Sequence, residues 1–217
     1  MSDLKISIII PTYNDVKLLR YTIESILKSK MRIEHYEILV CGDGSDQDKF
    51  SLIKLFEDKC NIRYFYQTDK GFRAGAARNM GILNAKAEIC LFIDTGLLIG
   101  SGTLNEFYEM VSKAHAAVLG YVYGFSNDND KIIESLIDVT DIDISIKNME
   151  MNKFLDRREV GYSALGDNLM MWPANLSPGF PAFHFEGIYY LTNGNPFNFS
   201  KIIYHFNHSQ YFLQSNS

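Results

Sequence analysis

The chain has 217 residues, of which 47% are hydrophobic and 22% are charged, and this composition excludes an intrinsically disordered protein. The net charge of −5 gives no reason to expect nucleic acid or an anionic membrane as a partner. We therefore expect one folded domain over residues 1–217.

The start of the chain, MSDLKISIII, passes directly into a strand pattern, so we expect no secretory leader. No run approaches the roughly 20 apolar residues that a membrane-spanning helix needs. Cys41, Cys60 and Cys90 are odd in number, and we expect those at strand positions to be buried small hydrophobic residues. These features favour a cytoplasmic location and are compatible with peripheral association with a membrane.

Residues 4–94 predict alternating strands and helices. Apolar runs predict strands at 4–10, 36–41, 62–66 and 89–93, and helical patterns fall at 16–29, at 47–59 and after residue 73. This alternation is typical of a parallel sheet with helical crossovers. The apolar positions that define the second and third helices are Phe50, Ile53, Leu55, Phe56, Ala76, Met80, Leu83 and Ala87.

Polar residues follow three of these strands. Pro11 ends the first strand, and Asn14 or Asp15 is well placed to cap the helix that follows. The segment 42–46 (GDGSD) is predicted to be a turn rather than a strand. The fourth strand leads to a lone carboxylate, Asp94. Because ligands of α/β sheets bind outside the carboxyl ends of strands, we expect these polar groups to lie together.

The stretch 70–100 (KGFRAGAARNMGILNAKAEICLFIDTGLLIG) indicates what the ligand is. Arg73 and Arg78 suit phosphate, because guanidinium binds it bidentately. Asp94 suits a divalent metal or a sugar hydroxyl. These residue types together predict a site for a nucleotide diphosphate.

After residue 94 the pattern loosens. We expect a helix at 101–115, a strand at 116–123, a polar loop at 126–130 and a helix at 148–158. Asp141 and Asp143 follow no suitable apolar strand, so we expect them in a solvated loop. From residue 161 onward aromatic residues, proline and asparagine dominate, as in a substrate-facing half with short strands.

Three segments resemble the family-2 glycosyltransferases with the GT-A fold. They are SIIIPTYN, YEILVCGDGSDQD and GFRAGAARNMGILNAKAEICLFIDTG, in the family's order and spacing. The later segments MMWPANLSPG and IIYHFNH are similar to acceptor-side segments of small members. The resemblance implies an α/β fold of the GT-A (Rossmann-like) type, with a mostly parallel sheet flanked by helices and a small mixed C-terminal part.

The resemblance also implies inverting transfer of a sugar from a nucleotide donor, commonly a UDP-sugar, to a hydroxyl group of a glycan, lipid-linked or natural-product acceptor. Asp43 would hold the base or ribose, and Asp94 would bind a divalent metal, Mn²⁺ or Mg²⁺, with His205 as a late metal or diphosphate contact. The remaining donor-site positions that the resemblance implies are Pro11, Thr12 and Tyr13 at the nucleoside and Arg73, Arg78 and Asn79 along the nucleotide.

The chain departs from the family pattern at the metal and at the general base. Where the family has acid-x-acid, the sequence reads Asp94-Thr95-Gly96, so a metal-independent site stays open. The segment after residue 177 is shorter than in the family and offers Glu186 or His184 as the base that an inverting transfer needs. The acceptor side would include Trp172 and Asn175, although Trp172 is equally compatible with core packing.

Two further functions remain as alternatives. A relative that holds a nucleotide-sugar without turnover, or that assists a partner transferase, fits the missing second acid and the shortened segment. A dinucleotide-binding oxidoreductase is disfavoured, because no G-x-G-x-x-G follows the first strand.

Overall fold

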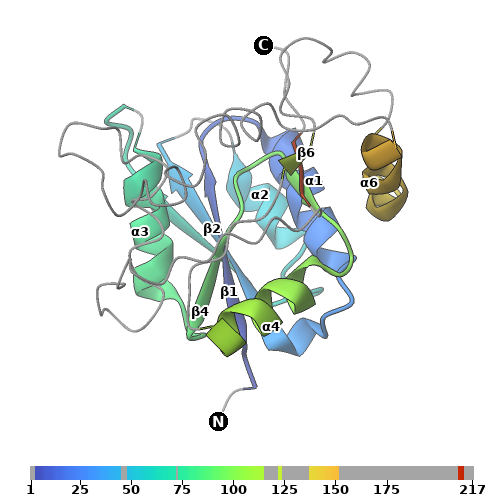
Figure 1. Ribbon diagram of the computed structural model, residues 1–217. Coiled ribbons are helices and arrows are strands. Elements are labelled where there is room, and N and C mark those ends of the chain that lie inside the picture. The colour runs from blue at the N-terminus through green and yellow to red at the C-terminus, as the bar shows by residue number, and fades with distance from the viewer. Residues whose placement is uncertain are drawn as a thin grey trace, which may run out of the picture.

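The computed structural model describes residues 3–44, 48–71, 73–114, 122–123, 137–151 and 210–212 (Figure 1). Its centre is a 4-stranded sheet in the order β3-β2-β1-β4. The strands are β1 (Ile6–Thr12), β2 (Tyr36–Asp43), β3 (Ile62–Gln67) and β4 (Ile89–Phe92), and every neighbouring pair is parallel. The predicted α/β class with a parallel sheet is confirmed.

The two central strands are buried along their whole length, which explains their continuous apolar sequences. Ile8 of β1 pairs with Ile38 of β2 on one side and with Leu91 of β4 on the other. β2 is longer than predicted, because Gly42 and Asp43 pair with β3 and extend the strand through the expected turn. The polar turn was predicted to begin at residue 42, but β2 continues to Asp43, so the turn begins two residues later.

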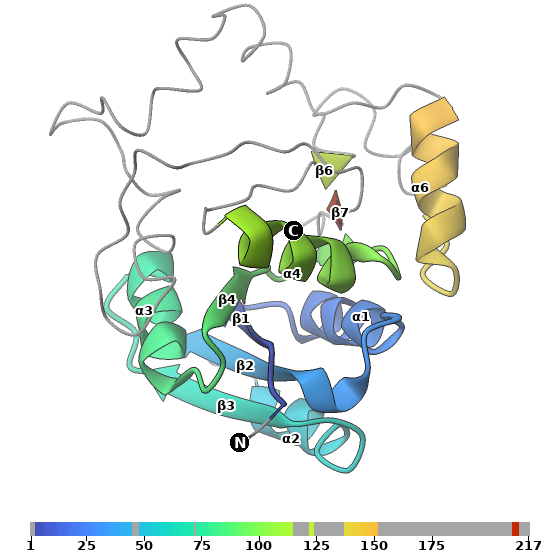
Figure 2. The same cartoon turned by 60° about the horizontal axis from the view of Figure 1, so that its bottom comes forward.

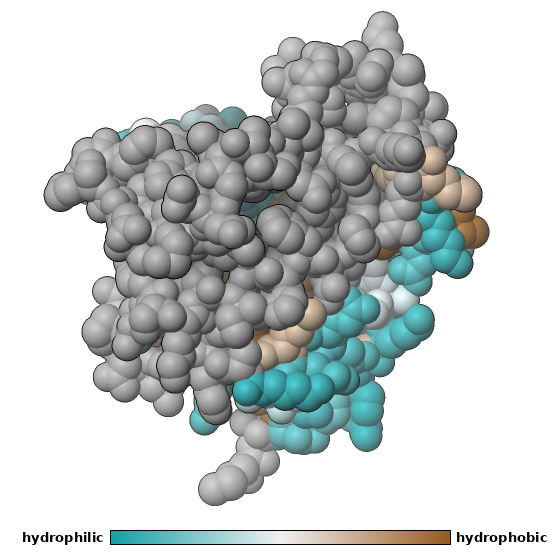
Figure 3. Space-filling model, in the orientation of Figure 1, coloured by the Kyte–Doolittle hydropathy of each residue, from teal (hydrophilic) through white to brown (hydrophobic). Residues whose placement is uncertain are grey.

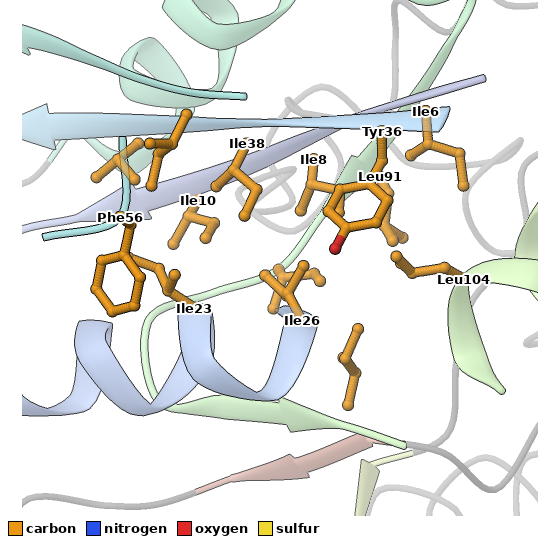
Figure 4. Packing of buried hydrophobic residues seen from close by; sticks show 14 of the residues in the cluster. Ile6, Ile8, Ile10, Ile23, Ile26, Tyr36, Ile38, Phe56, Leu91 and Leu104 are labelled. Carbon is orange, nitrogen blue, oxygen red and sulfur yellow. The ribbon is translucent and has the colours of Figure 1, made fainter. Parts of the chain in front are cut away.

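Helices cover both faces of the sheet (Figure 2). α1 (Val16–Leu27), α2 (Lys49–Lys54) and α4 (Thr103–Ala114) contribute to the core on one face, which we call the α1/α2 face. Figure 4 shows Ile23 and Ile26 of α1 opposite Ile8, Ile10 and Ile38 of the sheet. The Asp15 carboxylate caps α1 by accepting from the backbone N–H of Leu18 at 3.0 Å, as predicted. A short 3₁₀ helix, η1 (Ile33–His35), precedes β2.

α2 is shorter than the predicted helix at 47–59. Ile53 and Phe56 are buried as expected, whereas Phe50 and Leu55 are more than half exposed. The prediction is wrong for Phe50 and Leu55, because apolar spacing alone does not show which side of a short helix meets the sheet.

α3 (Ala74–Asn84) covers the opposite face, which we call the α3 face, through small residues. Its buried positions are Ala77 and Gly81, while Leu83 is 85% exposed, so the prediction that Leu83 lies on the core face is wrong. A Cβ added at Gly81 would lie 2.5 Å from Cγ2 of Ile9 and 3.1 Å from Sγ of Cys41. The absence of a side chain at Gly81 therefore sets how closely α3 approaches the sheet.

A buried polar network joins the strands near their amino ends on the α3 face. The fully buried carboxylate of Glu37 accepts from Oγ of Ser7 at 2.7 Å, from the backbone N–H of Lys86 at 2.7 Å and from Nη2 of Arg63 at 2.7 Å. Nη2 of Arg63 also donates to the carbonyl of Asn84 at 2.6 Å. The network links β1, β2, β3 and the segment between α3 and β4, at the end of the sheet away from the predicted ligand site.

A second, mixed sheet has the order β5-β7-β6 and is made of β5 (Leu97–Ile99), β6 (Val122–Tyr123) and β7 (Gln210–Phe212). β7 runs antiparallel to β5 and parallel to β6. This sheet agrees with the predicted small mixed C-terminal part. Of the predicted strand at 116–123, only residues 122–123 lie within the described residues.

α6 (Ile142–Met151) packs against this part of the chain, through a cluster that includes Leu98, Ile142 and Met149. Asp143 lies in α6, and its carboxylate accepts from the backbone N–H of Ser101 at 2.8 Å and from its Oγ at 2.6 Å. The prediction of a solvated loop is therefore wrong for Asp143, because distant donors and apolar contacts stabilise a helix there. Asp141 lies just before the helix, and its Oδ1 accepts from the backbone N–H of Ile144 at 3.0 Å. In the region of α6, Figure 3 shows hydrophobic residues at the surface.

The three cysteines are free thiols, and Cys41 and Cys90 are buried in strands, as predicted. Burial raises the pKa of both thiols to about 12. Within the described ranges, no helix is long and apolar enough to cross a membrane.

Candidate functional site

The carboxyl ends of the four parallel strands bring the predicted donor-site residues to one edge of the sheet. Thr12 at the end of β1 pairs with Gly42, and Asp43 at the end of β2 pairs with Gln67 at the end of β3. Asp94 follows β4. Parallel strands place these ends side by side, so three segments that are far apart in the sequence form one edge.

Asp43 is almost completely buried and is engaged by protein donors. Its Oδ2 accepts from the backbone N–H of Arg73 at 2.6 Å, and its Oδ1 accepts from Nε2 of Gln67 at 2.6 Å. The Arg73 guanidinium also approaches Oδ1, at 3.6 Å from Nη2. Asp43 thus fixes the residue that precedes α3. Whether it also contacts a base or ribose stays a prediction.

The segment after β3 completes this side of the edge, and the sequence analysis did not single it out. The Tyr13 hydroxyl donates to Oδ2 of Asp69 at 3.2 Å, and Oδ1 of Asp69 accepts from the backbone N–H of Gly71 at 2.9 Å. Gly44 has φ of 83°, and a Cβ there would lie 2.3 Å from Cα of Asp69. The signal that was available is the polar segment Thr68–Asp69–Lys70–Gly71, which directly follows an apolar strand.

Arg78 and Asp94 form an ion pair across the edge. Nη2 of Arg78 lies 2.6 Å from Oδ1 of Asp94; the Arg78 side chain is 16% exposed and that of Asp94 is 52% exposed. The loop that carries Asp94 is held by Thr95, whose hydroxyl donates to the carbonyl of Pro11 at 3.0 Å. The predicted arginine and carboxylate are therefore close enough to act on one diphosphate. Asn79, one residue further along α3, is exposed.

The acidic side chains at this edge offer little for a divalent cation. No group of three or more His, Cys, Asp or Glu side chains that could hold a metal occurs among the residues that the structure describes. Asp94 is the expected ligand, and one of its oxygens already accepts from Arg78. This donor set fits only a cation that takes most of its ligands from phosphate and water, as Mg²⁺ commonly does.

Three buried polar atoms at or beside this edge have no hydrogen-bond partner among the described residues: Oγ1 of Thr12, Nε of Arg73 and Nζ of Lys49. Buried polar groups in folded proteins are nearly always hydrogen-bonded. Lys49 is 1% exposed, and burial lowers its pKa to about 8. The sequence analysis missed Lys49; the available signal was a lysine three and four residues before the core residues Leu52 and Ile53. These atoms are suited to donate to a ligand.

The remaining predicted site residues lie outside the described residues. They are His184, Glu186, Trp172, Asn175 and His205. Their roles as base, acceptor contacts and late metal contact remain predictions from the sequence.

Similar proteins include several glycosyltransferases. A 35% identical relative over 130 residues is the validoxylamine A glucosyltransferase of Streptomyces hygroscopicus subsp. jinggangensis (strain 5008), with 57% of this chain and 30% of that protein aligned. The hyaluronan synthase of Pasteurella multocida is 38% identical over 89 residues, which are 41% of this chain and 9% of that protein. The chain thus spans less than a third of the length of these curated relatives.

A solved structure with a similar fold is S. aureus TarS 1–349 in complex with UDP-GlcNAc. It is 26% identical with a TM-score of 0.52, over 58% of this chain and 36% of that chain. The model of the family described as glycosyl transferase family 2 matches residues 7–171. This match includes the sheet edge with Thr12, Asp43, Arg73, Arg78 and Asp94. The chain therefore belongs to glycosyl transferase family 2.

Proposed function

We propose that the chain transfers a sugar from a nucleotide-sugar donor, with UDP-sugars as the first candidates, to a hydroxyl acceptor with inversion. The observation that carries the proposal is the pairing of Arg73 with Asp43 and of Arg78 with Asp94 at the carboxyl edge of the parallel sheet. Family membership and the UDP-GlcNAc complex of the similar TarS structure support a nucleotide-sugar as the ligand.

The arginines would stabilise the leaving group. When the bond between sugar and diphosphate breaks, negative charge develops on the diphosphate oxygens, and prepositioned guanidinium groups offset that charge. Arg78 would exchange its contact with Asp94 for one with the diphosphate, because a guanidinium can bind phosphate with two parallel N–H groups. The Nε–H of Arg73 has no partner among the residues that the structure describes, and we propose that it donates to the ligand.

A divalent cation would neutralise diphosphate charge in the same way. Asp94 would hold it together with the donor's phosphates, and His205 is a further candidate from the sequence. Glu186 or His184 would accept the proton of the acceptor hydroxyl, which an inverting transfer requires. We propose residues 1–100 as the nucleotide-binding half and 101–217 as the acceptor half, and a glycan, lipid-linked or natural-product hydroxyl as acceptor.

The test is donor turnover by the purified chain. UDP-, GDP- and dTDP-sugars are incubated with hydroxyl acceptors of the three classes, with Mn²⁺ or with EDTA, and free nucleotide is measured. We expect release of nucleotide from one donor class. Arg78→Met should lose most of the activity, because a charge-assisted contact is removed, whereas Arg32→Met, at a surface arginine 75% exposed, should not.

A binding-only protein is the alternative, favoured by the lone carboxylate at Asp94 where the resemblance implies two. Titration of the same nucleotides by calorimetry separates the two functions. Tight binding without release of nucleotide under every acceptor and metal condition would favour the alternative. Absence of both binding and turnover would contradict the proposal as a whole.

A further inference from the structure

Lys49 is a buried cation that no protein group neutralises among the described residues. It is 1% exposed, its ammonium has no hydrogen-bond partner, and burial alone accounts for the lowering of its pKa, with no carboxylate acting against it. An unpaired buried ammonium destabilises a folded chain. Groups of this kind are retained where a ligand completes them.

The side chain of Lys49 belongs to the α1/α2 face of the sheet, at the edge of the candidate site. Lys49 is the first residue of α2, and Leu52 and Ile53, three and four positions later on the same side of the helix, pack in the core of that face. Helical side chains lean towards the amino end of their helix. The amino end of α2 follows the carboxyl end of β2, so the ammonium is directed towards the strand ends.

Thr12 presents a second unsatisfied donor at this edge. It lies two residues after Ile10, whose side chain is in the α1/α2 core, and alternation along β1 puts Thr12 on the same face. Its hydroxyl is buried, and no described residue forms a hydrogen bond with it. Its neighbour in register is Gly42, where a Cβ would lie 2.6 Å from the hydroxyl of Tyr64. The hydroxyl of Tyr64 therefore occupies the space next to Gly42 that a side chain would otherwise fill.

The polar groups on this face are all able to donate. They are the ammonium of Lys49 and the hydroxyls of Thr12 and Tyr64. The nearby carboxylate of Asp48 is exposed and accepts from the backbone N–H and the hydroxyl of Ser51, and thereby caps α2. The ligand atom that suits this set is an oxygen that accepts hydrogen bonds.

The position relative to the arginines decides which oxygen this is. Asp43 and Arg73 lie on the α3 face, and Arg78 reaches the end of β4 from α3. The diphosphate in the proposed function belongs there. Lys49 and Thr12 belong to the opposite face. The resemblance implies that the nucleoside lies beside Thr12, with Asp43 reaching its base or ribose from the α3 face. We propose that Lys49, together with Thr12, recognises the carbonyl oxygen at position 4 of the donor's pyrimidine base.

This inference rests on the proposed function and adds a selectivity to it. At position 4, uracil and thymine carry a carbonyl where cytosine carries an amino group; at position 6, guanine carries a carbonyl where adenine carries an amino group. An ammonium that donates cannot pair with an amino group, and a buried polar group left without its partner rejects the wrong base strongly. The site should therefore prefer UDP over CDP, and Lys49 should be the residue responsible.

The experiment measures binding of UDP, CDP and inorganic pyrophosphate by calorimetry to the unchanged chain, to Lys49→Met and to Lys54→Met. Lys54 is an exposed lysine of the same helix, which lies over the Phe50 ring, and serves as the matched control. We expect Lys49→Met to weaken UDP binding by about tenfold or more, as loss of a charged hydrogen bond does. CDP and pyrophosphate binding should change by less than about threefold, because neither depends on the carbonyl contact. Lys54→Met should leave all three unchanged.

Urea unfolding without ligand gives a second readout. Lys49→Met should be at least as stable as the unchanged chain, because it removes an unpaired buried charge; a structural lysine would give a loss of stability or a failure to fold, which overturns the inference. Equal affinity of Lys49→Met and the unchanged chain for UDP also overturns the inference. If Lys49→Met loses affinity for UDP and for pyrophosphate to the same extent, Lys49 binds phosphate instead. If the unchanged chain binds no nucleotide, the proposed function fails, and this inference fails with it.

Discussion

Arg78 and Asp94 hold each other in the ligand-free chain, with 2.6 Å between Nη2 and Oδ1. The pair joins α3 to the segment that follows β4, across the edge where the donor would bind. Neither residue is fully buried, so both can change partners when a diphosphate arrives. The contribution of Asp94 to donor binding can be measured separately from that of Arg78.

Asp94→Ala should abolish the part of UDP binding that depends on Mn²⁺, because Asp94 is the carboxylate at this strand end that is expected to hold the cation. Binding in EDTA should fall far less. Calorimetric titration with and without Mn²⁺ measures both, and Asp58→Ala, at an exposed acid, is the control. Unchanged Mn²⁺-dependent affinity would remove Asp94 from the site.

Arg63→Met should destabilise the chain by roughly 3 kcal/mol, because the buried carboxylate of Glu37 would lose its cationic partner. Urea unfolding followed by circular dichroism measures the free energy of unfolding. Arg20→Met is the matched control, since Arg20 pairs with Glu24 on the exposed side of α1, and such pairs contribute less than about 1 kcal/mol. Similar losses for both variants would mean that the Glu37 network does not stabilise the fold.

Gly81→Ala should destabilise by about 1–3 kcal/mol, although alanine is intrinsically better than glycine within a helix. The added methyl group would lie 2.5 Å from Cγ2 of Ile9, so α3 must move away from the sheet. Leu83→Ala, at an exposed position of the same helix, should change the stability by less than about 0.5 kcal/mol. A stabilised Gly81→Ala chain would show that α3 is not closely packed there.

The contribution of Lys49 to stability should depend on pH. Its pKa is about 8 in the folded chain, against 10.5 as the ordinary value. Between these values the unfolded chain binds a proton that the folded chain does not, so the free energy of unfolding rises with pH. Relative to Lys49→Met, the unchanged chain should therefore gain on the order of 2 kcal/mol between these two pH values.

The comparison with Lys49→Met is needed because other groups act in the opposite direction. Burial raises the pKa of Cys41, Cys90 and Tyr36 to about 12. These groups ionise first in the unfolded chain and lower the stability at alkaline pH in both proteins. Unfolding midpoints at a series of pH values give the difference, and a constant difference would contradict a depressed pKa at Lys49.

The strands of the parallel sheet were predictable because their apolar runs are continuous, and the positions of Arg73, Arg78 and Asp94 followed from the order of elements. The end of β2 was not predictable from local sequence. Asp43 stays in the strand because Gln67 and the backbone of Arg73, 24 and 30 residues away, donate to it. Local turn preferences contain no information about such donors.

Other features depend on packing that spans the chain. Leu83 is exposed because α3 meets the sheet through the small residues Ala77 and Gly81, on another side of the helix. β5 pairs with β7, whose residues begin at Gln210, more than a hundred positions later. Lys49 could not be identified as a site residue, because an unpartnered ammonium is visible only once its surroundings are known.

The pairing of both arginines with carboxylates also affects the electrostatic potential that an approaching donor meets. Arg73 lies near Asp43 and Arg78 binds Asp94, so each positive charge is already balanced by a negative one. The two arginines therefore add little net potential at long range, and we expect the donor to be captured by local exchange of their partners. Its association rate should depend only weakly on ionic strength, unlike that of proteins that steer anions with uncompensated basic patches.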